Sequence, residues 1–131
     1  MTADPTPVEL VDRLRVGGPL LPTEVSFTDA QLRAYERAVG APVGDIVPEP
    51  LLVSACITAF DRTFPRVPGT LHLGQELGVL TPVAAGDVIS ITGHVATGQA
   101  SRRGWRFSLG FTGSTNRALC FHATMFGQVL L

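Results

Sequence analysis

Residues able to do acid–base chemistry stand just before the most apolar stretch of the chain. Asp45 and Glu49 lie in segment 41–50, whose three prolines deny it helical hydrogen bonds, so we expect a loop there. Residues 51–60 follow and are almost entirely apolar. For Asp45 the alternatives are a solvated turn aspartate and a catalytic acid or base. For Glu49 they are a carboxylate stabilised by the dipole of a following helix and a general base.

Three histidines, His72, His94 and His122, are the other candidates for proton transfer. Their spacing is not that of metal ligands, so we expect no metal site. His72 alternates with Leu71 and Leu73, which predicts a histidine that faces the surface or an interface. An acid–base role for His72 remains as the alternative.

The remaining reactive side chains favour structural roles. Cys56 and Cys120 lie in apolar stretches and are expected to be buried thiols rather than a disulfide. Tyr35, the only tyrosine, is expected to pack in the core with its hydroxyl at the edge. Arg102 and Arg103 are either solvated turn residues or a site for the phosphates of a carrier. The sequence contains no nucleophile elbow and no phosphate-binding loop, so we expect no nucleotide cofactor.

Two helices are predicted to position these groups. The first spans residues 29–39, because Thr28 and Gln31 form a capping box and Gly40 suits the left-handed conformation that ends a helix. The second spans residues 51–60. A helix that is apolar on every side must be enclosed by other elements, so this one is predicted to be central.

The second half of the chain has the pattern of a β-sheet. Polar and apolar residues alternate in four segments, which predicts antiparallel strands with one buried face. In the first of them, Leu71, Leu73, Leu77 and Val79 share the apolar face. A central helix followed by a four-stranded meander predicts an α+β fold in which the sheet wraps around the helix. The four segments are 71–79, 88–97, 105–112 and 118–127.

Composition limits the classes of protein to consider. The 131 residues suit a single domain, predicted over 23–131, after a lead-in segment 1–22 with a short helical patch at 8–14. Hydrophobic residues make up 45% and charged residues 16%, and the net charge is −1. These values argue against a nucleic-acid-binding protein, a disordered chain and a membrane span. The N-terminus does not resemble a signal peptide, so we expect a cytoplasmic protein. So few charges also predict a face covered by another subunit.

Three motifs carry a resemblance to a known family. Residues 27–40 look like its opening helix with an Ala-x-Gly end, 71–77 look like its second strand, and 81–87 contain its Pro-Val-x-x-Gly-Asp turn. On these motifs, residues 20–131 resemble the hotdog fold and, within it, the MaoC-like dehydratases and hydratases. The resemblance implies a substrate carried as a thioester on coenzyme A or acyl carrier protein.

The sequence departs from the family where active members carry a catalytic pair, in the pattern Gly-Asp-x-Asn-Pro-x-His. One alignment places Gly44 and Asp45 on this motif, with Val47 for the Asn and Pro50 for the His. The other places Gly40 on the first Gly and deletes the catalytic segment, and we prefer it because the apolar helix then directly follows the prolines. Either way the histidine is missing, so an altered acid–base site is expected.

The resemblance then implies which residues form the site. Asp45, Glu49 and His72 are the catalytic candidates, with His72 expected beside the start of the central helix, and Tyr35 is expected near an acyl tunnel. Free amides at the start of the central helix would hold the thioester oxygen. These amides are expected around Leu51, Leu52 and Val53.

Three functions follow from the resemblance. The first is a dehydratase, isomerase or cyclase with an altered acid–base pair, acting on an acyl or polyketide thioester. The second is a non-catalytic acyl-binding subunit of a heteromeric hydratase. A thioesterase ranks last, because it needs a carboxylate on the central helix and residues 51–60 contain none. The expected assembly is a homodimer or a heterodimer with a hotdog sibling, with no nucleic acid and no membrane as partner.

Overall fold

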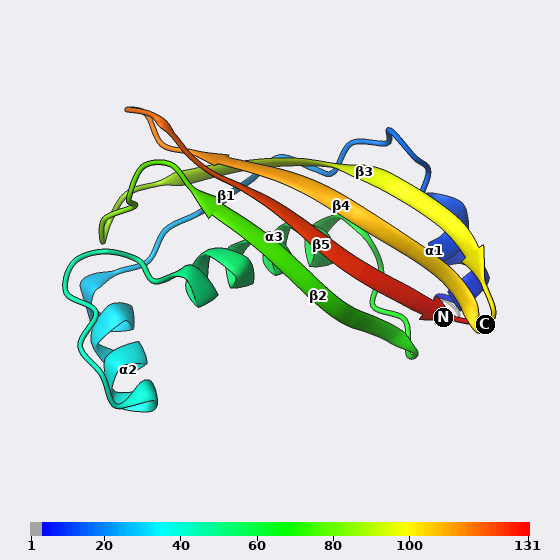
Figure 1. Cartoon of the computed structure of the whole chain (residues 1–131), viewed down its shortest axis with the longest axis horizontal. Coiled ribbons are helices and arrows are strands. Elements are labelled where there is room, and N and C mark those ends of the chain that lie inside the picture. Colours follow the sequence, from blue (N-terminus) through cyan, green and yellow to red (C-terminus); the bar gives the residue numbers. More distant parts are fainter. Residues whose placement is uncertain (1–3) are drawn as a thin grey trace.

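The computed structural model describes residues 4–131. Three helices and five strands make up this part of the chain (Figure 1). In chain order they are α1 Pro7–Arg13, β1 Thr23–Val25, α2 Asp29–Val39, α3 Glu49–Thr63, β2 Thr70–Val79, β3 Ile89–Ser101, β4 Gly104–Ser114 and β5 Leu119–Leu130.

The strands form one antiparallel sheet in the order β1-β3-β4-β5-β2. Strands β3, β4 and β5 are a meander, as predicted, but β2 pairs with β5 instead of β3. The predicted four-stranded meander is therefore wrong for β2, because segment 80–88 carries the chain from the edge strand β2 to β3, which lies next to the opposite edge strand β1. Strand β1 was not predicted, since its three residues are too few to show alternation.

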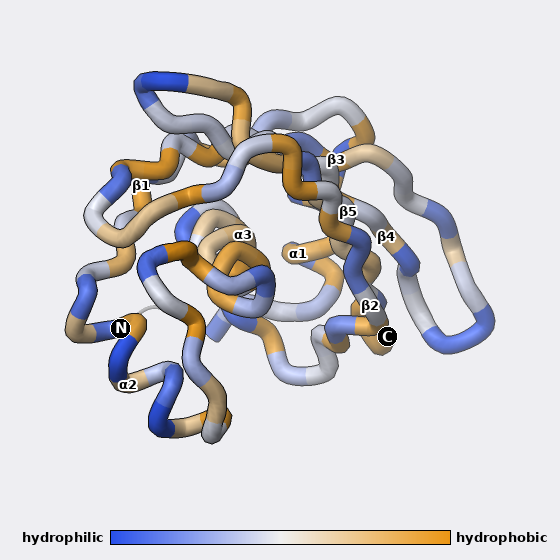
Figure 2. Tube along the Cα trace, turned by 60° about the vertical axis from the view of Figure 1, so that its left-hand side comes forward, coloured by the Kyte–Doolittle hydropathy of each residue, from blue (hydrophilic) through white to orange (hydrophobic). Residues whose placement is uncertain are grey.

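Helix α3 lies in the hollow of the curved sheet, which confirms the predicted α+β class and the central position of the helix (Figure 2). It begins two residues before the predicted segment 51–60 and ends three residues after it. Pro50 fits the first turn because a proline there gives up no intrahelical bond. The side chains of Leu52, Ala55, Cys56 and Ala59 are fully buried and form the face that packs on the sheet.

Helix α2 matches the predicted span of 29–39. The Thr28 side chain accepts the Gln31 N–H at 3.1 Å, and the Gln31 side chain accepts the Thr28 N–H at 2.7 Å, so the capping box is present. Gly40 has φ 73° and ends the helix. Helix α1, Pro7–Arg13, covers the predicted patch at 8–14 except for Leu14, which is its C-cap. Its Leu10 is completely buried, so the described part of the lead-in segment contributes to the core.

Strand β2 contains a β-bulge that changes which side chains face the helix. His72 pairs with Gly127 and Gly74 with Phe126, which leaves Leu73 as an extra residue between two regular stretches. An extra residue reverses the alternation of faces. The predicted common face of Leu71, Leu73, Leu77 and Val79 is therefore wrong. Leu71 is 42% exposed and Leu73 is 50% exposed.

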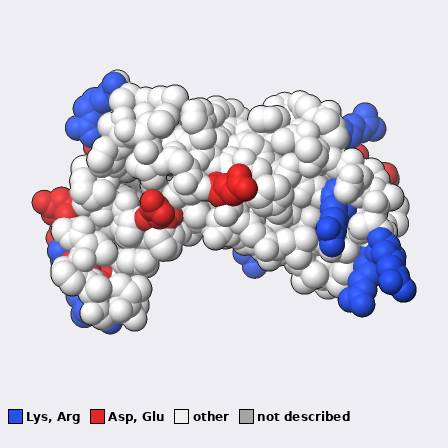
Figure 3. Space-filling model, in the orientation of Figure 1, with Lys and Arg blue, Asp and Glu red and all other residues white. Residues whose placement is uncertain are grey.

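The remaining structural predictions concern burial and charge. Both cysteines are buried and unpaired, as predicted, and burial raises the pKa of the Cys56 thiol to about 12. No helix of the described residues is long and apolar enough to cross a membrane. Charged side chains are sparse in the middle of the face shown in Figure 3 and are more frequent at its two ends.

Candidate functional site

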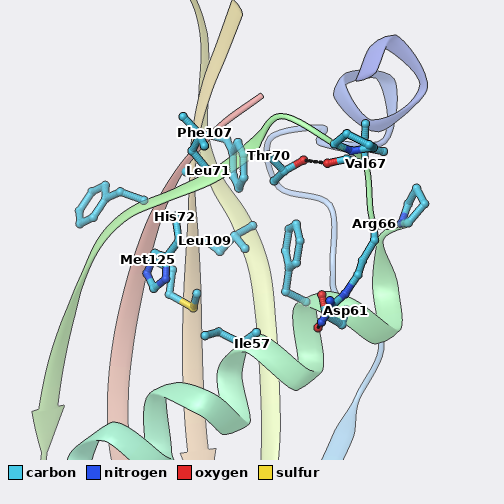
Figure 4. Close-up of a pocket in the computed structure, with 15 residues that line it drawn as sticks. Ile57, Asp61, Arg66, Val67, Thr70, Leu71, His72, Phe107, Leu109 and Met125 are labelled. Carbon is cyan, nitrogen blue, oxygen red and sulfur yellow. Dashed lines mark hydrogen bonds and ion pairs between the residues drawn. The ribbon is translucent and has the colours of Figure 1, made fainter. Parts of the chain in front are cut away.

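A cavity of about 500 Å³ lies between the second half of α3 and the sheet (Figure 4). Its volume falls within the range of small-molecule sites. Helix α3, the loop 64–69 and strands β2, β4 and β5 all contribute to its wall. The wall is mainly apolar, with Asp61, Arg66, Thr70 and His72 as its polar members. The apolar members include Ile57, Phe60, Val67, Leu71, Phe107, Leu109, Met125 and Phe126.

Helical spacing explains how α3 serves both the core and the cavity. Ile57, Phe60 and Asp61 are three and four residues apart, so they share one side of the helix. This side adjoins the buried side that packs on the sheet. The ring of Phe60 stacks on that of Phe107 from β4, with a centroid distance of 6.1 Å and an interplanar angle of 6°. The aromatic pair fixes one wall of the cavity.

A glycine in β5 makes room for this wall. A Cβ on Gly127 would lie 2.4 Å from the ring of Phe107, which is too close for any side chain. Gly127 is also the ladder partner of both Phe107 and His72. The missing side chain therefore lets the ring of Phe107 lie over Gly127 of β5, next to the backbone of His72, which pairs with Gly127 from the other side.

His72 reaches the cavity because of the bulge in β2. Its backbone pairs with Gly127, a residue of the inner face, so His72 lines the cavity, and it stays exposed because β2 is the sheet edge. The ring Nε2 lies 3.0 Å from the carbonyl oxygen of Gly74. A carbonyl only accepts hydrogen bonds, so Nε2 carries the proton and Nδ1 is left as the basic nitrogen.

An ion pair lies at the rim of the cavity. Arg66 Nη2 donates to Asp61 Oδ2 at 2.7 Å, and the side chains are 84% and 30% exposed, respectively. The hydrogen bond and the negative charge of Asp61 raise the pKa of Arg66. Asp61 also shows that α3 does carry a carboxylate, so the sequence-based reason for ranking a thioesterase last does not hold for the whole helix.

Asp45 and Glu49 lie near the opposite end of α3. Eleven residues separate Glu49 from Phe60, which is about 16 Å along a helix. Both carboxylates are exposed. The loop of Asp45 is held by backbone bonds: its carbonyl accepts the Ala85 N–H at 2.9 Å, and the Val47 N–H donates to the Val83 carbonyl at 2.8 Å.

Helix α2 holds the other side of this loop. Glu36 accepts the Val43 N–H at 2.7 Å and pairs with Arg33 at 2.8 Å, and Arg33 also donates to the Gly44 carbonyl. These bonds explain why Asp45 has a defined place without taking part in a cavity. Tyr35 is half-buried on the same helix and is not among the residues of the cavity wall.

The start of α3 offers fewer free amides than expected. Pro50 has no N–H, and the amides of Leu51 and Leu52 both donate to the Pro48 carbonyl, at 3.0 and 3.4 Å. Leu52 is buried in the core, while Leu51 and Val53 are half-buried. Within residues 4–131, the first-turn amide without a partner is that of Glu49. The amides of Leu51 and Leu52 thus already have an acceptor, and an oxyanion hole around Leu51, Leu52 and Val53 stays a prediction.

Of the catalytic candidates, His72 alone is placed at the cavity, and it does not lie beside the start of α3 as expected. Asp61, Arg66 and Thr70 were missed by sequence reasoning. The first two stand beyond the apolar segment, and no local pattern marks them as neighbours of a strand. No cluster of three or more possible metal-binding side chains occurs among the described residues.

Comparisons with known proteins agree on the architecture. The sequence matches no protein-family model and no curated protein. A solved structure titled as an (R)-hydratase from A. caviae involved in PHA biosynthesis is 19% identical. It aligns over 88% of this chain and 96% of its own, with a TM-score of 0.70.

Two further solved structures are similar. A monoamine oxidase regulatory protein from Archaeoglobus fulgidus is 14% identical over 98% of both chains, with a TM-score of 0.77. The ChsH1-ChsH2 complex from Mycobacterium tuberculosis is 15% identical over 88% of this chain and 98% of the other, with a TM-score of 0.67. With the five-stranded antiparallel sheet around α3, these similarities show that the chain has the α+β hotdog fold.

Proposed function

We propose that this protein binds an acyl or polyketide chain, carried as a thioester on coenzyme A or acyl carrier protein, and acts on it as a dehydratase-type enzyme. The reaction class is dehydration, double-bond isomerisation or cyclisation of a β-carbonyl or β-hydroxyl substrate. The observation that carries the proposal is the apolar cavity of about 500 Å³ with an imidazole in its wall. The (R)-hydratase among the similar structures supports the reaction class.

His72 is the acid–base group of this mechanism. Nδ1 takes the proton from the carbon next to the thioester carbonyl, and the electron pair forms the new double bond. In dehydration the carbon–oxygen bond at the β-carbon breaks, and the imidazolium returns the proton to the leaving hydroxyl group, which departs as water. In isomerisation the same proton returns to another carbon. The hydrogen bond from Nε2 to Gly74 holds the ring in the tautomer that this step requires.

Asp45 and Glu49 take a smaller part in this proposal than the resemblance implied. Neither lines the cavity, and Glu49 stands about 12 Å along α3 from Ile57, the nearest cavity residue on this helix. A thioester held with its acyl end beside His72 does not bring its reacting carbons to either carboxylate. We therefore assign the chemistry to His72, and variants of the two carboxylates serve as controls.

A non-catalytic acyl-binding subunit is the second candidate function. The observation that favours it is the separation of His72 from every carboxylate that the resemblance implied. The cavity would then hold the acyl chain while a sibling subunit supplies the acid–base pair. The ChsH1-ChsH2 complex is a precedent for pairing of two different chains in a similar structure.

Both candidates include a second subunit along β2. The outer edge of β2 has no strand beside it within the described chain, and Leu71, Leu73 and Val79 are 42%, 50% and 40% exposed on it. An unpaired edge with exposed apolar residues is suited to pairing with another strand. A homodimer or a heterodimer with a hotdog sibling is therefore part of the proposal.

Assay of the purified chain distinguishes the two candidates. The chain is mixed with 3-hydroxyacyl and 2-enoyl thioesters, and formation or loss of the enoyl thioester is followed by ultraviolet absorbance. Turnover that disappears in His72→Gln supports the enzyme and contradicts the non-catalytic subunit. Binding without turnover contradicts the enzyme and supports the subunit. If calorimetry detects no binding of any thioester, both candidates fail.

A further inference from the structure

Acidic and basic residues are distributed unequally along the chain. All eleven Asp and Glu residues precede β3, whereas the part of the chain from β3 to Leu131 contains four arginines and no carboxylate side chain. One of the four, Arg117, pairs with Asp87 at 2.6 Å. The others are exposed, and within the described chain none of them pairs with a carboxylate. These unpaired arginines are Arg102, Arg103 and Arg106.

The three unpaired arginines lie together at one end of the sheet. Arg102 and Arg103 form the two-residue turn between β3 and β4. Arg106 is the ladder partner of Gln128, whose side-chain amide donates to the Ser101 hydroxyl at 3.3 Å. The turn is therefore held against β5 beside Arg106. Figure 3 shows blue side chains gathered at the right-hand end of the molecule, where Figure 1 places this hairpin.

Exposed apolar side chains accompany these arginines on the outer face of the sheet. Phe126 and Leu130 stand two residues before and after Gln128 on β5, so they share its face, and they are 39% and 37% exposed. Four residues of a strand span about 13 Å. Arginine and aromatic residues beside apolar area are typical of protein–protein interfaces. We call Arg102, Arg103, Arg106, Phe126 and Leu130 the end patch.

The end patch adjoins the rim of the cavity. The Leu131 N–H donates to the Arg103 carbonyl at 3.0 Å, and the Leu130 N–H donates to the Gly69 carbonyl at 3.0 Å. The hairpin, the end of β5 and the loop after α3 therefore lie side by side. This loop carries Arg66, which stands at the rim and is 84% exposed. A partner bound to the end patch is thus placed beside the cavity.

We infer that the end patch docks a carrier protein with an acidic surface, which delivers the thioester substrate to the cavity on a flexible arm. Unpaired arginines attract an acidic surface and steer its approach. The exposed Phe126 and Leu130 supply apolar contact area that a protein surface uses and the phosphates of coenzyme A do not. The inference rests on the proposed function and specifies which carrier presents the substrate.

The end patch leaves room for the second subunit of the proposed function. Its residues belong to β4, β5 and the turn before β4, whereas the unpaired outer edge of the sheet belongs to β2. The backbone edge of β2 therefore stays available to another strand when the end patch is covered.

One acyl group on three carriers tests the inference. An octanoyl group, which has no hydroxyl group to lose, is attached to an acidic acyl carrier protein, to coenzyme A and to pantetheine. Calorimetry measures the dissociation constant of each thioester for the full-length protein. We expect the carrier-protein thioester to bind at least about tenfold more tightly than the pantetheine thioester. Equal binding of these two contradicts the inference.

Charge reversal locates the docking surface. Arg103→Glu and Arg106→Glu are each expected to weaken binding of the carrier-protein thioester by at least about fivefold and that of the pantetheine thioester by less than about twofold. Arg37→Glu is the matched control, because Arg37 is exposed on α2 and has no ion-pair partner within residues 4–131. An equal loss in Arg37→Glu would show a general effect of net charge and overturn the assignment. If a reversed charge prevents folding, Arg103→Gln and Arg37→Gln replace the pair.

Two further measurements separate the contributions to docking. Leu130→Ser is expected to weaken binding of the carrier-protein thioester by about threefold through lost apolar contact. Raising the salt concentration from about 0.05 to about 0.5 M should weaken the same complex severalfold and leave the pantetheine complex unchanged. Carrier-protein binding that does not respond to salt contradicts docking through the arginines.

The outcomes separate the inference from the proposed function. If the coenzyme A thioester binds as tightly as the carrier-protein thioester and is weakened equally in Arg103→Glu, the arginines bind phosphates. The docking inference then fails while acyl-thioester binding stands. If none of the three thioesters binds, the proposed function itself fails. Tight binding of the carrier-protein thioester that is lost in Arg103→Glu and retained in Arg37→Glu supports both.

Discussion

The two ends of α3 carry different kinds of residue, and a cavity lies beside the C-terminal half. At its N-terminal end stand Asp45 and Glu49, two exposed carboxylates near a loop that backbone hydrogen bonds hold in place. At its C-terminal half the helix borders a cavity of about 500 Å³ with apolar walls and one imidazole. The N-terminal end has two carboxylates without a cavity, and the C-terminal half has the cavity that a substrate requires.

Reactive residue types and a binding cavity therefore have to be located separately in this protein. Asp45, Glu49 and His72 are all exposed, so exposure does not distinguish them. His72 differs in position, because the bulge in β2 places it in the cavity wall. Asp45 and Glu49 are candidates by residue type alone.

The strongest test of this contrast removes the candidate acid–base groups at each end of α3 in turn and compares the losses of activity. His72→Gln is expected to lower kcat/KM by about 10² or more, the usual loss when a general acid–base group is removed. The double variant Asp45→Ala with Glu49→Ala is expected to retain activity within about threefold, since neither residue reaches the cavity. The assay follows the enoyl thioester by absorbance. A larger loss in the double variant than in His72→Gln reverses the assignment.

The two sides of α3 are expected to differ in stability. Leu52→Ala removes a side chain that is 1% exposed in the core and should lower the free energy of unfolding by about 2–5 kcal/mol. Ile57→Ala, at the cavity wall, should cost clearly less, about 1–2 kcal/mol, because one side of Ile57 already lacks packing partners. Urea denaturation followed by circular dichroism measures both. Equal losses would show that the cavity is packed like the core.

Cys56 lies between the two ends and reports on burial in the middle of the helix. Its pKa is raised from 9.0 to about 12, so the folded protein binds this thiol proton more tightly than the unfolded chain. This contribution to stability is fully present below pH 9 and is lost as the pH rises toward 12. The folded protein should therefore react negligibly with a thiol reagent at pH 8, while urea exposes two thiols. Rapid reaction of the native protein contradicts the burial of both cysteines.

The rim ion pair should have the smallest effect. Arg66→Ala removes a side chain that is 84% exposed, so the free energy of unfolding should change by less than about 0.5 kcal/mol. Asp61→Asn is the matched change on the other side of the pair and should behave alike. Thermal denaturation of both variants checks this. A loss above about 1 kcal/mol would assign the pair a structural role at the C-terminal end of α3.

Local patterns predicted the elements whose residues carry their own signals. The capping box of Thr28 and the glycine at 40 define α2, and the alternation of residues 105–112 defines β4. The apolar segment 51–60 indicated a central helix, because such a helix must be enclosed. These signals depend on residues that are neighbours in the sequence, and the elements that they predict are present in the structure.

Features that depend on distant residues were not predictable in the same way. Pairing of β2 with β5 is a choice between two sheet edges, and no residue of β2 marks it. The sequence of residues 71–79 predicts a regular alternation of inner and outer side chains, and the bulge at Leu73 interrupts it. His72 therefore lies at the cavity instead of on the predicted outer face. Asp61 from α3 and His72 from β2 line the same cavity, but no pattern in the sequence indicates that these two residues lie close together.

The bulge has a consequence for how this site tolerates change in evolution or in engineering. Deletion of the single codon for Leu73 would restore regular pairing between β2 and β5. His72 would still pair with Gly127 and Gly74 with Phe126, so the imidazole would keep its place on the inner face. The extra residue of the bulge is thus a position of β2 whose loss leaves every paired side chain on its present face.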